Sequence, residues 1–318
     1  MRLVHYASSD ETNRPGTPPN KSSLRWKRAG DGRWILRWIK LVAILSLWLF
    51  FFGIVIVVQC WMSALRHPNR WKIVSRCMRS LTGLMRVILN IQVKVDGNVR
   101  QFAGGGYVIV SNHLGYLDGI VLGSLLPVIF VSKQEVKSWP LIGQWTALCG
   151  TVFINRERKG LIPLAVKEIS RRLEQQANIL LFPEGASTNG ERILPFQTAP
   201  FAAALRSGAI IVPVTLSYQT IDGQPVSATN RDLIYWYGDM GFFPHLWKLL
   251  ALRQVKVRVT IQPTLDCSEY ENDSAGRRRL ADDCYHRILG QINRRVKEDG
   301  KGHRQSGIHR RFQPRTKK

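Results

Sequence analysis

The sequence predicts an α/β fold, in which a largely parallel mixed sheet is flanked by helices and preceded by a membrane-associated helix or helical hairpin. Short β-rich runs alternate with helical segments over residues 92–262. This alternation is typical of parallel strands covered on both faces. A second observation predicts the membrane element: residues 41–58 are apolar and uncharged, and the uncharged stretch continues to Leu65. That length matches the roughly 20 residues that a helix needs to cross a bilayer.

The chain divides into five predicted parts. At 318 residues and 45% hydrophobic composition, it has room for one substantial domain with appendages. The tail holds seven basic and no acidic residues after Asp299, which is typical of segments that are solvated or contact anionic lipid. The parts are a basic disordered N-terminus (1–33), membrane-anchoring helices (34–92), the α/β domain (93–265), an amphipathic helix (266–298) and a basic disordered tail (299–318).

The formal net charge of +24 indicates an anionic partner, because such an excess of Lys and Arg repels itself. Nucleic acid and anionic lipid both fit, and the apolar segment favours lipid. A cleaved signal peptide is the alternative, but its apolar core is usually 7–15 residues long and closer to the N-terminus. Basic residues flank the segment on both sides, so a simple span, a dip into one leaflet and a helical hairpin all remain open. Residues 71–91 form an amphipathic helix that lies either on the membrane or on the domain.

The five cysteines have no paired CxxC spacing, so the sequence indicates neither a zinc site nor a disulfide framework. A reducing compartment is the simpler inference. We therefore expect no metal and no cofactor, and a location at the inner membrane with the α/β domain on the cytoplasmic side.

The elements of the domain follow from local pattern. Helices are expected at 120–126, 161–176 and 200–207, and a closing amphipathic helix at 275–296. The last strand alternates valine or isoleucine with polar residues, so one face is buried. The predicted strands are 92–95, 107–110, 128–131, 151–154, 179–182, 210–215 and 255–262.

His113 and Asp118 follow the strand 107–110 directly, at the carboxyl end where open α/β sheets place their chemistry. An imidazole with a nearby carboxylate can deprotonate a hydroxyl. The alternative is structural: Asp118 caps the next helix and His113 bonds a loop carbonyl. Three more strand-like runs deliver Arg156, Glu184 with Gly185, and Pro213 at or near their ends.

In this order, the motifs H-x-x-x-x-D (113–118), F-I-x-R (153–156), F-P-E-G (182–185) and V-P-V (212–214) resemble the glycerolipid acyltransferase family, which includes 1-acylglycerol-3-phosphate acyltransferases. The resemblance covers roughly residues 91–220. It implies a membrane-bound enzyme of phospholipid biosynthesis that transfers a fatty acyl group from acyl-CoA or acyl carrier protein to the hydroxyl of a lysophospholipid. It also implies an N-terminal pair of helices that docks the enzyme on membrane lipids.

A thioester is already activated, so such an enzyme needs a base and a grip on both substrates rather than a nucleophile of its own. We expect His113 to be the general base and Asp118 to hold the imidazole in the correct tautomer. Arg156 is the candidate phosphate ligand, with an exposed ion pair as the alternative. The resemblance implies acceptor binding by Glu184 and Gly185, with a capping carboxylate as the alternative for Glu184. Lys133 is a weaker candidate for phosphate or CoA.

Two departures from the family bear on the acceptor. Ala186, Ser187 and Thr188 stand where many members have Thr-Arg, and residues 196–199 read F-Q-T-A instead of F-K-x-G. Both changes remove positive charge or backbone freedom near the expected headgroup pocket. The acceptor is therefore either 1-acylglycerol-3-phosphate, a related lysolipid or a lyso-aminolipid.

Competing classes lack their motifs. No G-x-S-x-G elbow or H-E-x-x-H pair occurs, and the glycines at 104–106 precede a strand instead of linking strand to helix. A non-catalytic basic membrane protein is the alternative from another class, but the His113–Asp118 pair is superfluous for it. We expect no nucleic-acid partner.

Overall fold

The sheet contains the seven predicted strands and two short ones, and it positions the site. The computed structural model describes residues 33–139, 142–155 and 158–305. Within them the strands are β1 (Ile91–Asp96), β2 (Tyr107–Ser111), β3 (Val128–Lys133), β4 (Val152–Ile154), β5 (Asn178–Leu181), β6 (Ile210–Ile221), β7 (Gln224–Pro225), β8 (Val255–Ile261) and β9 (Leu265–Asp266).

The main strand order is β1-β8-β6-β2-β5-β3-β4, with β7 and β9 paired to β6. The pairs β1/β8, β2/β6, β2/β5, β3/β5 and β3/β4 are parallel, whereas β6 runs antiparallel to β8. The prediction of a largely parallel mixed sheet flanked by helices is confirmed. β2, which leads to His113, lies in the middle of this order between β5 and β6.

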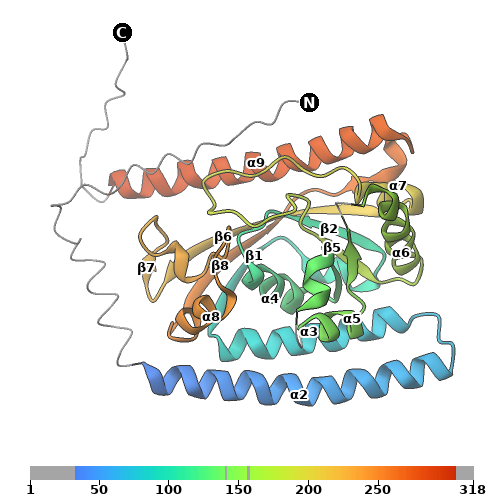
Figure 1. Cartoon of the computed structure of the whole chain (residues 1–318). Coiled ribbons are helices and arrows are strands. Elements are labelled where there is room, and N and C mark those ends of the chain that lie inside the picture. The colour runs from blue at the N-terminus through green and yellow to red at the C-terminus, as the bar shows by residue number, and fades with distance from the viewer. Residues whose placement is uncertain (1–32, 140–141, 156–157, 306–318) are drawn as a thin grey trace, which may run out of the picture.

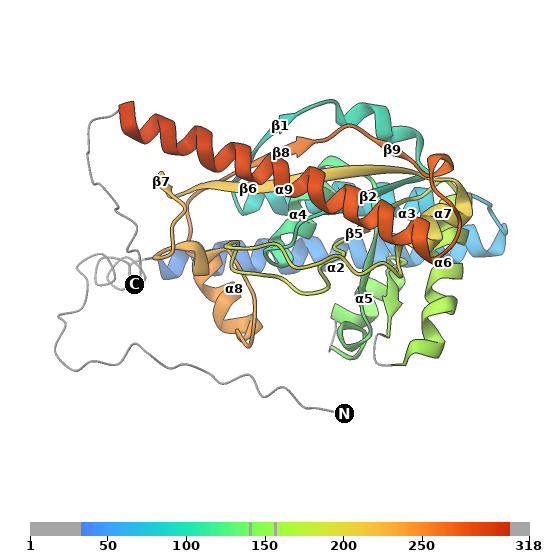
Figure 2. The same cartoon turned by 90° about the horizontal axis from the view of Figure 1, so that it is seen from above.

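Helices cover both faces of the sheet (Figures 1 and 2). These helices are α4 (Tyr116–Leu125), α5 (Ile142–Leu148), α6 (Ile162–Glu174), α7 (Phe201–Ser207), α8 (Phe242–Leu250) and α9 (Ser274–Gln305). Alternate residues of β2 enter two cores: Val108 and Val110 pack in the core shared with α6, α7 and α9, and Ile109 packs in the one shared with α4 and α8. This follows from the two-residue period of a strand.

Some elements differ from the sequence-based expectation. α5, α8, β7 and β9 were not predicted. α8 contains Pro244 at its third position, where a proline is tolerated because the first-turn N–H groups have no intrahelical partner. α9 continues to Gln305, past residue 298 where we placed its end, and no proline interrupts it before that point. The predicted domain boundary at 92/93 falls inside β1.

The N-terminal pair of helices is α2 (Trp34–Ala64) and α3 (Arg70–Ile88), which run along the base of the domain in Figure 1. α2 is long and apolar enough to cross a membrane, and only 11% of its most apolar 18-residue stretch is buried. Its outer stripe is therefore largely exposed, and in the described part of the chain Trp38 on that stripe contacts Trp247 of α8. That stripe includes Trp34, Ile35, Trp38, Ile39, Val42, Leu45, Leu49, Phe50, Val57 and Trp61.

Polar bonds attach α2 to the domain near both ends. Arg33 bonds Asp222 at 2.5 Å just before the helix, and the buried Lys40 donates to the Leu252 carbonyl at 2.6 Å. Towards the other end, Gln59 donates to the Leu148 carbonyl at 2.7 Å. A helix of 31 residues is about 46 Å long at 1.5 Å per residue. α2 thus lies along the domain over most of its length.

Candidate active site

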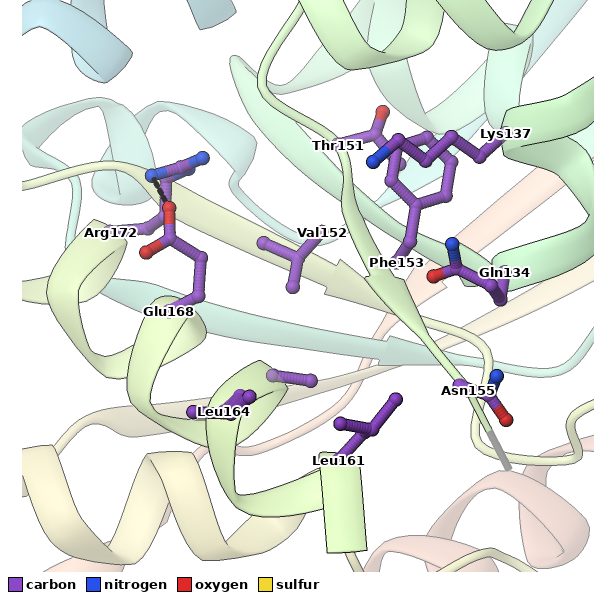
Figure 3. A pocket seen from close by; sticks show the side chains of 11 residues that line it. Gln134, Lys137, Thr151, Val152, Phe153, Asn155, Leu161, Leu164, Glu168 and Arg172 are labelled. Carbon is purple, nitrogen blue, oxygen red and sulfur yellow. Dashed lines mark ion pairs between the residues drawn. The ribbon is translucent and has the colours of Figure 1, made fainter. Parts of the chain in front are cut away.

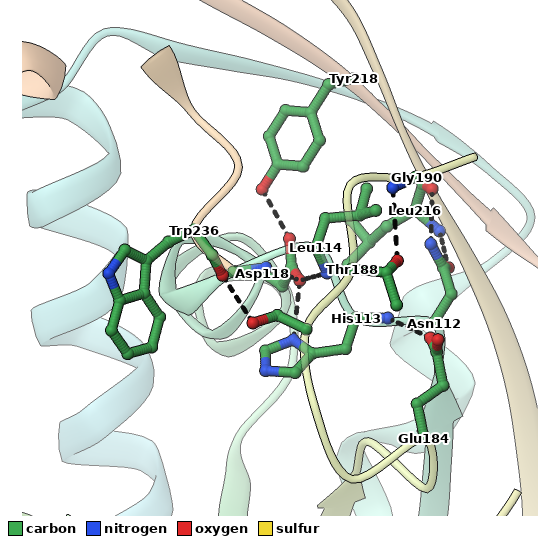
Figure 4. Close-up of polar contacts among 12 residues, drawn as sticks. Asn112, His113, Leu114, Asp118, Glu184, Thr188, Gly190, Leu216, Tyr218 and Trp236 are labelled. Carbon is green, nitrogen blue, oxygen red and sulfur yellow. Dashed lines mark hydrogen bonds and ion pairs between the residues drawn. The ribbon is translucent and has the colours of Figure 1, made fainter. Parts of the chain in front are cut away.

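The side chains of His113 and Asp118 point toward one another at the carboxyl end of β2 (Figure 4). His113 Nδ1 lies 2.9 Å from Asp118 Oδ2. The imidazole is 22% exposed, whereas the carboxylate is fully buried. Nε2 is on the other side of the ring, and within the described part of the chain it has no hydrogen-bond partner. A substrate hydroxyl can approach that nitrogen.

Asp118 also caps α4, so the two roles that the sequence left as alternatives are combined in one carboxylate. It is the third residue of the helix, and its Oδ2 accepts the backbone N–H of Leu114 at 2.6 Å and of Gly115 at 3.0 Å. Its other oxygen, Oδ1, accepts the Tyr218 hydroxyl at 2.8 Å. Three donors besides the imidazole therefore stabilise a buried negative charge.

These bonds have a consequence for the oxyanion. The N–H groups of Leu114 and Gly115 donate to Asp118, so in this conformation they do not face a substrate carbonyl. Asp118 takes these N–H groups because a carboxylate at the third helical position lies close to them. From the sequence, the backbone around Gly115 and the amino end of the following helix are candidate donors to the oxyanion of acyl transfer, and this role stays a prediction.

Neighbouring residues hold the His113 loop in place. The Asn112 side chain bonds both the N–H and the carbonyl of Leu216, which ties the end of β2 to β6. Phe182 stacks on the imidazole with ring centroids 4.2 Å apart, and the Thr188 N–H donates to the His113 carbonyl. These contacts fix the orientation of the imidazole ring and its position relative to the sheet.

Glu184 lies behind His113 and is nearly fully buried. Its Oε1 accepts the His113 N–H at 2.7 Å, and its Oε2 accepts the Leu194 N–H at 2.9 Å. The carboxyl group thus joins the His113 loop to the segment around Leu194. Burial raises the pKa of Glu184 to about 7, and its two backbone hydrogen bonds offset part of that rise.

This pKa predicts a pH-dependent stability. Between about pH 4.5 and 7 the unfolded chain loses the Glu184 proton while the folded chain keeps it. The stabilisation from this group is therefore complete below about pH 4.5 and is lost as the pH rises through 7, a change of about 3 kcal/mol. The free energy of unfolding, measured by denaturant in detergent, should fall less between pH 4.5 and pH 8 for Glu184→Gln than for wild type. Equal declines would contradict this assignment.

A model of the family described as Acyltransferase matches residues 90–217. A lyso-ornithine lipid O-acyltransferase of Rhizobium meliloti is 31% identical over 239 residues, which cover 73% of this chain and 76% of that protein. The chain belongs to this acyltransferase family. It is accordingly an O-acyltransferase.

A second relative and a solved structure are also acyltransferases. A 1-acyl-sn-glycerol-3-phosphate acyltransferase of Neisseria meningitidis is 30% identical over 167 residues, covering 52% of this chain and 63% of that protein. The crystal structure of PlsC, the 1-acyl-sn-glycerophosphate (LPA) acyltransferase of Thermotoga maritima, has a TM-score of 0.51 at 17% identity. It covers 80% of this chain and 97% of the other. That likeness shows a shared fold.

The other predicted site residues of the acyltransferase are placed as follows. Gly185 has a φ of +78°, in the left-handed region that favours glycine, so the chain turns sharply after Glu184. Lys133 is exposed at the carboxyl end of β3, two strands from β2. Arg156 lies outside the described residues. Substrate binding by Arg156, Glu184, Gly185 and Lys133 stays a prediction.

Sequence reasoning missed Tyr218, which reaches Asp118 from 100 positions away in the chain. The run Val212, Val214, Leu216 and Tyr218 has the two-residue period of one strand face, and all four are buried. That pattern could have indicated that the hydroxyl lies inside the domain. It could not have indicated Asp118 as its partner, because strand pairing decides that.

A separate cavity of about 340 Å³ lies between β4 and α6, with β5 and β3 between it and the strand that leads to His113 (Figure 3). Arg172 at one end is buried, bonds Glu168 and packs over the Trp71 ring. We therefore assign the chemistry to the His113 loop rather than to this cavity. Its lining is Gln134, Lys137, Thr151, Val152, Phe153, Asn155, Leu161, Leu164, Ala165, Glu168 and Arg172.

Proposed function

We propose that this acyltransferase moves a fatty acyl group from acyl-CoA or acyl carrier protein to the hydroxyl of a lyso-aminolipid of the lyso-ornithine lipid class, with His113 as the general base. The observation that carries the chemistry is the His113–Asp118 pair, whose imidazole has a buried carboxylate on one nitrogen and an accessible position at the other.

In the proposed reaction, His113 Nε2 accepts the proton of the acceptor hydroxyl as its oxygen attacks the thioester carbonyl carbon. The new C–O bond forms and the C–S bond breaks. The departing sulfur takes the proton back from the imidazolium, so the products are an acylated lipid and a free thiol. Asp118 keeps Nδ1 protonated and stabilises the transient imidazolium, as in a triad whose serine is replaced by the substrate.

Two observations favour a lyso-aminolipid over a phosphate-bearing acceptor. The relative from Rhizobium meliloti, with 31% identity over most of both chains, is named a lyso-ornithine lipid O-acyltransferase. In addition, Ser187 stands where many family members have arginine, and its hydroxyl donates to the Trp236 carbonyl at 2.5 Å. A serine held in this way offers no positive charge to a phosphate. The similarity to a 1-acyl-sn-glycerol-3-phosphate acyltransferase keeps that substrate as the second candidate.

A panel of acceptors tests this proposal. With long-chain acyl-CoA, we expect kcat/KM for lyso-ornithine lipid to exceed that for lysophosphatidic acid at least about tenfold, or 1.4 kcal/mol in transition-state binding. Ser187→Arg should narrow this ratio by improving use of the phosphate acceptor, and Ser187→Ala is the matched control that adds no charge. A wild-type preference for lysophosphatidic acid would reverse the acceptor assignment.

We also propose that the enzyme is attached to the inner membrane by α2 lying in the plane of the bilayer surface, with the domain on the cytoplasmic side. Two features support the in-plane arrangement: the bonds of Arg33, Lys40 and Gln59 to the domain, and an apolar stripe exposed on one side only. A helix crossing the roughly 30 Å hydrocarbon core could not keep protein contacts near both ends. The five free cysteines support a reducing compartment.

Labelling from one side of the membrane tests this topology. Ser23→Cys, which precedes α2 in the chain, and Lys256→Cys, an exposed position on β8, can both be made in a Cys60→Ser chain. An impermeant thiol reagent should label both from the same face of sealed vesicles. Labelling of the two positions from opposite faces would show that α2 spans the bilayer.

A further inference from the structure

Helix α8 lies outside the region matched by the family model and carries three distinct rows of side chains at i, i+4 spacing. His245 and Leu249 are buried against the domain. Phe242 and Leu246 are partly buried: Leu246 packs with Tyr116 against the core of that face, and Phe242 contacts the Tyr116 ring. The third row is Phe243, which is 76% exposed, and Trp247.

The inner rows connect α8 to the start of α4, which follows the His113 loop. His245 Nδ1 lies 2.8 Å from the hydroxyl of Tyr116, which begins α4 only a few residues after His113. Phe242 contacts Tyr116 with ring centroids 5.2 Å apart, and Trp139 and Trp236 complete an aromatic cluster around it. A continuous cluster of aromatic side chains therefore runs from α8 to Tyr116, the first residue of α4 and the third residue after His113.

The outer row is continuous with the exposed stripe of α2. Trp247 contacts Trp38 edge-on at 5.3 Å, and Arg37 packs over the same ring. Trp38 is 51% exposed and belongs to the stripe that we assign to lipid. In Figures 1 and 2, α8 lies beside the N-terminal half of α2, whereas α6 lies at the far end of the sheet.

Charge at the edge of this surface fits an anionic lipid headgroup. Lys248 on α8 and Arg253 just after it are both exposed. Cations beside an aromatic and apolar surface are the arrangement that interfacial helices use, because the rings enter the acyl boundary while the cations stay among headgroups. Moving an exposed phenylalanine ring from water into the acyl boundary lowers the free energy of the system.

We propose that α8 is a second lipid-contacting helix, with Phe243 inserted among the acyl chains, and that the aromatic surface between α8 and Tyr116 is the side from which the lysolipid passes from the bilayer to His113. This inference rests on the proposed membrane attachment and lysolipid acceptor. It assigns α8 a task that neither the anchor helix α2 nor the catalytic pair performs.

Kinetics with two presentations of the acceptor test this route. For a long-chain lysolipid in phosphatidylglycerol vesicles, Phe243→Ser should raise the apparent KM about tenfold with little change in kcat. For a short-chain acceptor below its micelle concentration, the same variant should match wild type. Phe243→Leu should retain low KM in vesicles, and Leu164→Ser, which changes a 63% exposed leucine on α6, is the matched control. An unchanged KM in vesicles, or an equal rise for both acceptors, would overturn the proposal.

A binding measurement separates this proposal from the proposed reaction. Burial raises the pKa of the Cys77, Cys149, Cys267 and Cys284 thiols, so a Cys60→Ser chain carrying Phe243→Cys is labelled selectively at neutral pH. A fluorophore at position 243 should be quenched by lipids with a spin label on the acyl chain, whereas one on Leu164→Cys should not. Quenching without any acyl transfer would leave the lipid contact standing and remove the proposed function. Absence of quenching at 243 would remove the contact itself.

Discussion

Replacement of His113 by alanine should lower kcat about 10²- to 10⁴-fold, which is the usual contribution of a positioned general base. The imidazole is the only group in the described part of the site that combines an accessible nitrogen with a buried carboxylate partner. The loss should fall on kcat more than on the lysolipid KM, because the base acts in the transition state. Initial rates with acyl-CoA and lyso-ornithine lipid in detergent micelles measure both.

The matched control is His286→Ala, which removes an exposed histidine on α9. It should leave kcat within about twofold of wild type. Circular dichroism and thermal unfolding of His113→Ala should stay close to wild type, since its side chain is partly exposed and its backbone bond to Glu184 remains. A folded His113→Ala enzyme with near-normal kcat would eliminate the general-base assignment.

The second large effect is expected for Asp118→Asn, which should lower both stability and activity. An asparagine amide directs N–H groups at the N–H donors of Leu114 or Gly115, or at the Tyr218 hydroxyl, so buried donors lose their acceptor. Each such loss costs about 1–3 kcal/mol, and more for a charged acceptor. We expect a destabilisation of about 2–4 kcal/mol. We also expect kcat to fall at least about 100-fold, because the imidazole loses its tautomer control.

Thermal or denaturant unfolding and single-turnover acyl transfer, run on the same preparation, separate these two consequences. Asp239→Asn changes an exposed aspartate in the loop before α8 and is the matched control for loss of one charge. Tyr218→Phe removes only the donor to Oδ1 and should reduce stability by less than Asp118→Asn. Wild-type stability for Asp118→Asn would show that the carboxylate is not the acceptor of these bonds.

The periodicity of the chain was enough to predict the main strands and their place in an α/β sheet, because side-chain alternation is a local property. β2, β3 and β8 lie within two residues of their predicted limits, whereas β6 extends to Ile221 where we placed its end at Thr215. The short strands β7 and β9 were missed, since two residues have no period to detect. α8 was missed because it is short and begins with two phenylalanines and a proline.

The sequence by itself determined which residues can do the chemistry: His113 and Asp118 are five positions apart after an apolar strand, and their contact is local. Only the tertiary structure decided what surrounds them. Tyr218 on β6 donates to Asp118, Glu184 after β5 accepts from the His113 N–H, and His245 on α8 bonds Tyr116 at the start of α4. Those contacts depend on strand order and helix packing, which bring together residues whose separation along the chain carries no periodic signal.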